Sequence, residues 1–568
     1  MLPLLRIENL SLDFVSNGQH TPALRHISFT VNKGEIVALV GESGSGKSVT
    51  SLSILQLLPA PPAVYRSGSI LFAADGKTAA NLLELSPSAL QKIRGNQVSM
   101  IFQEPMTSLN PVMTCGRQVM EALQLHKKIS QQDAREKTLQ WFERVKLPNP
   151  QAIFNRYPHQ LSGGQKQRVM IAMAMCCEPS LLICDEPTTA LDVTVQKTIL
   201  QLIKELQQQT GMGVIFITHD LGVVAEIADR TIVMYKGEIA EEGTVTHIFN
   251  QPAHPYTKGL LACRPVLYPK NVRLPVVADF LNASGSTPPP PAPAMQATED
   301  VQAGELLMDV RRLSVWFPAT KNFFGKALHH TRAVDDVSFP VYKGETLGLV
   351  GESGCGKTTL GRTLLQLIPA TSGEIIYAGK NMADISPKEL HALRKEVQIV
   401  FQDPYSSLNP RLDIGSAIAE PMKVHGLYGN ARQRKEKAVE LLEKVDLKAE
   451  HYSRYPHEFS GGQRQRIVIA RALALQPSFI VCDESVSALD VSVQAQVLNL
   501  LNDLKKELQL TIIFISHDLS VVHYISDRII VMNKGKIEET GTAHEVFNHP
   551  QMAYTQQLIA SIPRGLTA

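Results

Sequence analysis

Two short glycine-rich segments have the residue types and the spacing that hold a phosphate group. Each follows an apolar run predicted as a buried strand and opens a run with helical periodicity. Glycines let backbone N–H groups surround a phosphate at the positive end of the helix, a lysine reaches its outer oxygens, and a hydroxyl ligates Mg²⁺. A single segment of this kind could be an ordinary glycine-rich turn, but two of them between a strand and a helix predict a nucleotide site in each half. The loop residues are Gly41, Ser43, Gly44, Gly46, Lys47 and Ser48, and Gly351, Ser353, Gly354, Gly356, Lys357 and Thr358.

Two adjacent carboxylates end an apolar run downstream of each loop, as Asp185-Glu186 and Asp483-Glu484. The aspartate would hold Mg²⁺, directly or through water, and the glutamate would polarise an attacking water molecule. Taken alone, such a pair is more often a solvated turn. Because it follows a phosphate-binding loop twice, we predict ATP hydrolysis, with ATP and Mg²⁺ bound in both halves.

The motifs recur in the same order, which indicates a duplicated domain. Equivalent residues such as Ser162 and Ser460, or His219 and His517, are 298 positions apart. A chain of 568 residues also exceeds the length of about 300 at which single cores stop growing. We predict a first ATP-binding domain at 1–266, a Pro/Ala/Ser-rich linker at 267–303 and a second ATP-binding domain at 304–568. Four consecutive prolines in the linker favour extended backbone.

In the first half, short β-branched runs alternate with segments that have helical periodicity, and these elements must position the residues named above. Continuous apolar strands separated by helices favour an α/β fold with a largely parallel sheet that is covered on both faces. The predicted strands are 35–41, 180–185, 213–218 and 231–235, and the predicted helices include 47–58 and 195–208.

Composition excludes several classes of protein. The net charge of +2 is too balanced for a general nucleic-acid binder. No run approaches the ~18 apolar residues that span a bilayer, and the N-terminus lacks the apolar core of a secretion signal. The seven cysteines include no C-x-x-C pair, so we expect neither a disulfide framework nor a zinc site, in a protein of the reducing cytosol.

A further motif, Leu-Ser-Gly-Gly-Gln in the first half and Phe-Ser-Gly-Gly-Gln in the second, stands between each phosphate loop and its acidic strand end. With it, the chain resembles the ATP-binding-cassette (ABC) family over nearly its whole length outside the linker. The resemblance implies two P-loop NTPase domains, each with a RecA-like core, an antiparallel β subdomain and an α-helical subdomain. The signature residues are Ser162, Gly163, Gly164 and Gln165, and Ser460, Gly461, Gly462 and Gln463.

The resemblance also implies roles for single residues in each half. Gln103 and Gln402 match the Q-loop glutamine that senses Mg²⁺ and the γ-phosphate. Asp192 and Asp490 match the D-loop aspartate, and His219 and His517 match the switch histidine at the γ-phosphate. Phe14 and Phe317 match the aromatic residue that stacks on adenine, although ordinary burial of aromatic side chains explains them equally well. The implied catalytic residues are Glu186, His219, Glu484 and His517, and the implied metal ligands are Ser48, Gln103, Asp185, Thr358, Gln402 and Asp483.

In this family each ATP lies between the phosphate loop of one domain and the signature of the other. Ser162 to Gln165 would therefore complete the site of Lys357, and Ser460 to Gln463 that of Lys47. Each site keeps its glutamate and histidine, so we expect both to hydrolyse ATP. The second half has Ser485 where the first has the usual Pro187, which allows some asymmetry between the two sites.

Other segments resemble the ATPases of dipeptide, oligopeptide and nickel importers, among them Ser-Leu-Asn-Pro after each Q-loop and His-Pro-Tyr-Thr at 254–257. The fused architecture is similar to glutathione-importer ATPases and to those of Yej-type microcin and peptide importers. The resemblance implies two membrane permease subunits, a separate substrate-binding protein, and a place at the cytoplasmic face of the inner membrane, with no nucleic acid and no direct cargo contact. No iron–sulfur cluster is expected, since the first copy offers only Cys263 after its 254–261 segment and the second copy ends without cysteine. A permease-free twin-cassette ATPase that acts on ribosomes or DNA is the competing class.

Overall fold

The computed structural model describes residues 2–16, 18–189, 191–270, 272–282, 304–321, 327–487 and 489–563. These residues form two units, one of 2–261 with 277–282 and 563, the other of 262–276 with 304–562. The proline run of the predicted linker, 288–291, lies outside the described residues. The domain boundaries at 266 and 303 stay predictions.

A six-stranded sheet forms the centre of the first unit, in the order β10-β9-β3-β8-β7-β6. Its strands pair in parallel, except for β10 at one edge, which is antiparallel to β9. Along β7 the side chains of Leu181 and Ile183 enter one hydrophobic core, and those of Leu182 and Cys184 enter another. This two-sided burial confirms the predicted sheet. The strands are β3 (Ile36–Val40), β6 (Val98–Ile101), β7 (Leu181–Asp185), β8 (Gly213–Thr218), β9 (Arg230–Tyr235) and β10 (Glu238–Thr244).

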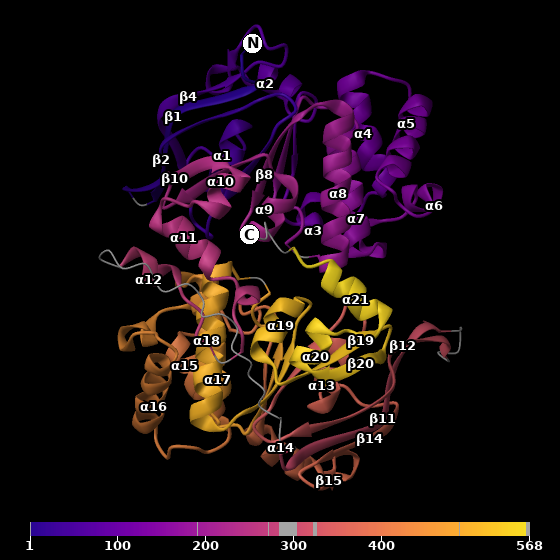
Figure 1. Ribbon diagram of the computed structural model, residues 1–568, viewed down its shortest axis with the longest axis vertical. Coiled ribbons are helices and arrows are strands. Elements are labelled where there is room, and N and C mark those ends of the chain that lie inside the picture. The colour runs from indigo at the N-terminus through magenta and orange to yellow at the C-terminus, as the bar shows by residue number, and fades with distance from the viewer. Residues whose placement is uncertain are drawn as a thin grey trace. The chain divides into compact units, whose positions relative to one another are not determined.

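Each face of this sheet carries a different layer in the first unit. One core joins it to a four-stranded antiparallel sheet, in the order β2-β1-β4-β5. The other core joins it to a group of helices that includes α4 to α8, and Figure 1 shows these helices gathered apart from β1, β2 and β4. The three parts match the RecA-like core, antiparallel β subdomain and α-helical subdomain of an ABC cassette.

The remaining elements of the first unit are β1 (Leu5–Ser16), β2 (Gln19–Val31), α1 (Lys47–Ile54), β4 (Ala63–Phe72), β5 (Ala80–Asn81), η1 (Leu82–Glu84), α2 (Pro87–Ile93), α3 (Pro105–Ser108), α4 (Cys115–Lys127), α5 (Gln131–Arg144), α6 (Pro150–Phe154), η2 (Pro158–Gln160), α7 (Gly163–Met175), α8 (Val193–Thr210), α9 (Leu221–Ile227), α10 (Val245–Asn250), α11 (Pro255–Ala262) and α12 (Val277–Leu281).

The second unit repeats this architecture, with sheets in the orders β16-β17-β18-β13-β19-β20 and β12-β11-β14-β15. Its elements are η3 (Pro265–Leu267), β11 (Leu306–Lys321), β12 (Ala327–Tyr342), β13 (Thr346–Val350), α13 (Lys357–Leu364), β14 (Ser372–Tyr377), β15 (Lys380–Asn381), η4 (Met382–Asp384), α14 (Pro387–Glu396), β16 (Val397–Val400), α15 (Ile414–Val424), α16 (Ala431–Lys444), η5 (Ala449–Ser453), η6 (Pro456–Glu458), α17 (Gly461–Leu473), β17 (Phe479–Asp483), α18 (Val491–Leu508), β18 (Thr511–Ile515), α19 (Leu519–Ile525), β19 (Arg528–Asn533), β20 (Lys536–Thr542), α20 (Ala543–Asn548) and α21 (Ala553–Ala560).

The predicted helix 47–58 is too long, because α1 ends at Ile54. Gln56 has a positive φ of 48°, which takes the chain out of the helix before Pro59. The predicted helix 195–208 is slightly short, because α8 runs from Val193 to Thr210 and ends at Gly211 with φ 64°. Across the described residues, no helix has both the length and the hydropathy needed to cross a membrane.

A glycine in the first turn of α4 lets this helix pack closely on α6. A Cβ atom added at Gly116 would lie 2.2 Å from Cδ2 of Phe154. The second unit repeats the contact, with a Cβ at Gly415 only 2.3 Å from Cδ2 of Tyr452. These contacts belong to the helical subdomains, which also carry the signature helices α7 and α17.

We therefore expect Gly116→Ala to lower the free energy of unfolding by about 1–3 kcal/mol, because the methyl group forces the Phe154 ring out of a packed core. The urea midpoint of the first unit measures this loss. Glu121→Ala, at an exposed position of the same helix, is the matched control and should shift stability by no more than about 0.5 kcal/mol. Equal stability of Gly116→Ala and the parent chain would show that the contact is not tight.

Candidate functional site

The first phosphate loop connects β3 to α1. Gly46, the residue before α1, has φ 105°, and a Cβ there would lie 2.8 Å from Cδ2 of Leu24, so both conformation and space require glycine. The buried Lys47 ammonium donates to the carbonyl oxygens of Gly41 (2.7 Å) and Glu42 (3.0 Å). The loop therefore wraps around its own lysine at the positive end of α1, where an anion is favoured.

The second loop has the same geometry between β13 and α13. Lys357 donates to Gly351 O at 2.7 Å and to Glu352 O at 3.0 Å, and Gly356 has φ 110°. Both copies therefore hold the lysine in one position relative to the loop, as the sequence predicts for a duplicated phosphate site.

Two tyrosines that the sequence reasoning missed support these loops. The hydroxyl of Tyr256 accepts a hydrogen bond from Glu42 N (2.9 Å), and that of Tyr554 accepts one from Glu352 N (3.2 Å). Tyr256 is fully buried. The available signal was a Tyr-Thr pair that recurs 298 positions apart, within the segment that the sequence assigned only to a subfamily.

The aspartates at the strand ends lie beside the loop hydroxyls. Ser48 Oγ donates to Asp185 Oδ1 (3.0 Å), and Thr358 Oγ1 donates to Asp483 Oδ1 (2.8 Å). Burial raises the pKa of Asp185 to about 6, and burial also raises the pKa of Asp483. A hydroxyl and a carboxylate in one place form an oxygen donor set that fits Mg²⁺, which would also relieve the buried negative charge.

The carboxylate of Glu186, at the end of β7, contacts three polar side chains. Its Oε2 accepts from Thr189 Oγ1 (2.8 Å) and Gln103 Nε2 (3.1 Å), and His219 Nδ1 lies 3.3 Å away. Burial raises the pKa of Glu186, but the hydrogen bonds and charge of its neighbours outweigh burial and lower this pKa to about 2. The side chain therefore stays ionised at neutral pH. Its φ of 46° is a strained conformation of the kind often found at functional sites.

Glu484 repeats this arrangement with one difference. Gln402 Nε2 donates to its Oε2 (2.9 Å), and His517 Nδ1 lies 3.4 Å away. Burial raises the pKa of Glu484, but His517 outweighs it and the pKa is lowered. Ser487 stands in place of Thr189, and among the described residues its buried hydroxyl has no hydrogen-bond partner. The two carboxylates are thus held by different numbers of donors.

The signature motifs form the first turns of α7 and α17. Ser162 Oγ accepts from Gln165 N (3.3 Å), and Gln165 Oε1 accepts from Ser162 N (3.2 Å), which closes a capping box. Ser460 and Gln463 repeat it. The glutamine side chains therefore cap their own helices. Both serines are exposed, so each helix presents its positive end at the surface.

The remaining predicted residues lie on other elements. Phe14 is a partly buried residue of β1 that packs on the adjoining core, whereas Phe317 of β11 is 40% exposed. Asp192 and Asp490 precede α8 and α18 as their N-terminal caps. Their neighbours Ala190 and Ala488 lie outside the described residues.

Comparison with known proteins agrees with this geometry. The profile of the ABC transporter family matches residues 24–189 and 334–487. That of the oligopeptide/dipeptide transporter C-terminal region matches 240–281 and 539–565, the segments that contain Tyr256 and Tyr554. The chain is 49% identical over 567 residues to the glutathione import ATP-binding protein GsiA of Escherichia coli O157:H7, and the match covers 99% of this chain and 89% of the relative.

Other relatives match to the same extent. The GsiA protein of Salmonella typhimurium is 49% identical over 562 residues, and that of Escherichia coli K12 is 48% identical over 567 residues, each covering 99% of this chain and 89% of the relative. With two copies each of the family's phosphate loop, signature and acidic strand end, the chain belongs to the ABC transporter family as an ATPase with two fused cassettes.

Proposed function

We propose that this chain hydrolyses ATP to drive a binding-protein-dependent importer of glutathione or short peptides. The observation that carries the proposal is the duplicated cluster of phosphate-loop lysine, aspartate, glutamate, glutamine and histidine at the end of each parallel sheet. Near-complete coverage by relatives named for glutathione import favours this cargo over nickel or microcins. Peptide import in general is supported by the match to the oligopeptide/dipeptide C-terminal region.

Lys47 and the loop N–H groups would bind the β- and γ-phosphates, and Lys357 would do the same in the second half. Ser48 with Asp185, and Thr358 with Asp483, would hold Mg²⁺, which neutralises charge on the phosphates. Gln103 and Gln402 would complete these metal sites.

Glu186 would act on the water molecule that attacks the γ-phosphorus. Because its carboxylate is ionised and held by Thr189, it accepts a hydrogen bond from the water and aligns it for in-line attack. His219 would exchange its contact with Glu186 for one with the γ-phosphate, which links the state of the nucleotide to the carboxylate. Glu484 and His517 would act in the same way.

Family membership further implies that the signature of one cassette closes over the ATP bound by the other. Ser162 to Gln165 would complete the ATP site of Lys357, and Ser460 to Gln463 would complete that of Lys47. The exposed helix ends at Ser162 and Ser460 offer the donors that this role needs. ATP binding would draw the cassettes together, and hydrolysis with phosphate release would let them part.

A groove in the second unit fits a permease helix. It has a volume of about 430 Å³, runs between the edge strand β16 and the helices α15 and α17, and is lined by Phe401, the residue before Gln402. Apolar side chains dominate it, and Val424 at its rim is 63% exposed. An amphipathic helix from one of two membrane permeases would bury its apolar face there. The chain would then work at the cytoplasmic face of the inner membrane, with a separate binding protein that delivers the cargo.

We expect Glu186→Gln and Glu484→Gln each to lower steady-state phosphate release by at least half, because one of two hydrolytic sites loses its charged carboxylate. The double variant should fall by about 10²–10⁴-fold. Glu178→Gln, on an exposed side chain, is the matched control and should retain full turnover. Full activity in either single variant would contradict two working sites.

Uptake of labelled glutathione by cells tests both cargo and docking. Cells lacking this chain should lose uptake, and the parent chain should restore it.

The Val424→Asp chain should hydrolyse ATP but fail to restore uptake, because its carboxylate would have to lose its water against the apolar face of the permease helix. Leu306→Asp, at another exposed apolar position, should restore it. Unchanged glutathione uptake after deletion, with loss of peptide uptake, would reassign the cargo, and rescue by Val424→Asp would refute docking in this groove.

A further inference from the structure

The segment that leaves the first cassette packs into the second unit. Residues 262–270 and 272–276, which we name the strap, are grouped by their contacts with residues 304–562. The short helix η3 within the strap packs against α19. Leu274 of the strap is 1% exposed. The strap is therefore a folded part of the second unit, although it precedes that unit in the sequence.

Side chains of the second cassette bind the strap through its backbone. The buried Asn499 of α18 accepts from Leu274 N (2.9 Å) and donates to Leu274 O (2.8 Å), so its amide pairs as a neighbouring strand would. The hydroxyl of Tyr524, on α19, donates to Val272 O (2.9 Å). Two buried polar side chains thus donate hydrogen bonds to the backbone of the strap, which fixes its position.

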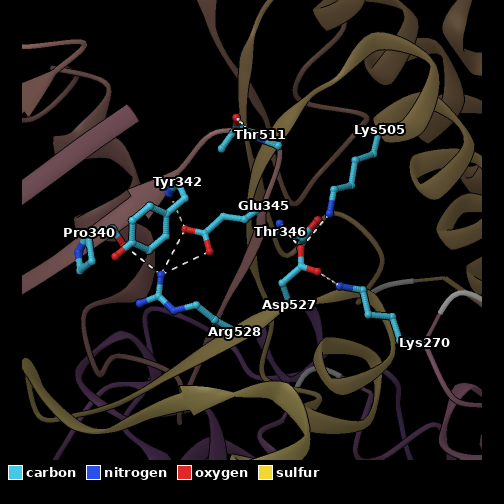
Figure 2. Close-up of polar contacts among 10 residues, drawn as sticks. Lys270, Pro340, Tyr342, Glu345, Thr346, Lys505, Thr511, Asp527 and Arg528 are labelled. Atoms are coloured by element: carbon cyan, nitrogen blue, oxygen red, sulfur yellow. Dashed lines mark hydrogen bonds and ion pairs between the residues drawn. The ribbon is translucent and has the colours of Figure 1, made fainter. Parts of the chain in front are cut away.

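The strap also supplies a charge to the second cassette. The ammonium group of Lys270 pairs with Asp527 Oδ1, and Lys505 Nζ lies 2.8 Å from Asp527 Oδ2 (Figure 2). Burial raises the pKa of Asp527, but the two ammonium groups outweigh burial and lower it. Asp527 is therefore an ionised carboxylate, held by one lysine from the strap and one from α18.

Asp527 in turn holds the strand that carries the phosphate loop. Its Oδ2 accepts from Thr346 N (2.7 Å), and its own N–H donates to Thr346 O (2.8 Å). Thr346 begins β13, the fully buried strand that runs into Gly351 and the second phosphate loop. Beside it Arg528 pairs with Glu345 (3.3 Å), as Figure 2 shows. A chain of direct contacts thus runs from Lys270 through Asp527 to the start of this strand.

The first cassette has the carboxylate but not the same surroundings. Asp229 Oδ2 accepts from Ile36 N (2.8 Å) at the start of β3, as Asp527 does at β13. The residues that contact the strap, and the lysine that shares Asp527 with it, differ, however, at the equivalent positions 298 residues earlier. Asn499, Lys505 and Tyr524 correspond to Gln201, Gln207 and Glu226, and Gln207 donates instead to Gly34 O (2.6 Å). The strap contacts are therefore a feature of the second cassette.

We propose that Lys270 is a positioning residue for the second ATP site, which tightens nucleotide binding there by holding Asp527 against the start of β13. The inference rests on the proposed function for its nucleotide and concerns the site of Lys357 alone. It makes one ATP site of this twin ATPase dependent on the chain segment that joins the cassettes.

The test compares Lys270→Met, which keeps the aliphatic stem, with Lys270→Arg, which keeps the charge. Binding of tritiated ATP with Mg²⁺ is measured in full-length Lys47→Ala, where only the second site binds, and in full-length Lys357→Ala, where only the first does. We expect Lys270→Met to weaken the binding of ATP about threefold in the Lys47→Ala chain and to leave it unchanged in the Lys357→Ala chain. Lys270→Arg should restore the affinity. Lys204→Met, which truncates a lysine of α8, is the matched control and should change neither site.

Hydrogen exchange of the chain without nucleotide supplies a second readout. Lys270→Met should speed exchange in peptides of Thr346–Val350 and leave those of Ile36–Val40 unchanged. Equal effects on both ATP sites, or no effect on either, would overturn the inference, as would unchanged exchange in β13. If neither P-loop variant removes bound ATP, the proposed function fails separately, and the exchange result still decides whether the strap controls the strand.

Discussion

Four parallel strands that are buried on both faces impose the constraint from which each site follows. In the first cassette, side chains of β3, β6, β7 and β8 enter the hydrophobic cores on both faces of the sheet, so charged side chains are placed where these strands end. Lys47, Gln103, Glu186 and His219 each follow one of these strands. Segments far apart in the sequence therefore meet at one edge, and Glu186 contacts both Gln103 and His219 there.

Because the cassette is duplicated, equivalent contacts in the two copies can be compared directly. Distances around Lys47 and Lys357 agree, and so do those of the capping boxes at Ser162 and Ser460. The copies differ around the catalytic glutamates, where Thr189 donates and Ser487 does not, and at the strap, which only the second cassette binds through Asn499. Loops with matching lysine contacts but different supports favour the proposal of two hydrolytic sites that are not equivalent.

Residues with local signals could be predicted from the sequence, and residues fixed by distant contacts could not. The loops, acidic strand ends and signature helices depend on short motifs, and the sheet on apolar runs of the right length. The end of α1 could not be predicted, because the residue with positive φ that ends it is Gln56 and not a glycine. Tyr256 and Lys270 act on groups far along the chain, so their partners became visible only in the fold. The sequence assigned residues 262–266 of the strap to the first domain and the rest of the strap to the linker, so it gave no sign that the strap packs into the second unit.

We propose that each ATP is bound by the loop of one cassette and closed by the signature of the other. This arrangement can be tested by trapping a photoreactive ATP analogue with vanadate in the Ser162→Arg chain and identifying the labelled peptides by mass spectrometry. We expect the half that carries Lys357 to lose its label, while the half that carries Lys47 keeps its label. Loss from the half that carries Ser162 itself, or label retained in both halves, would contradict it.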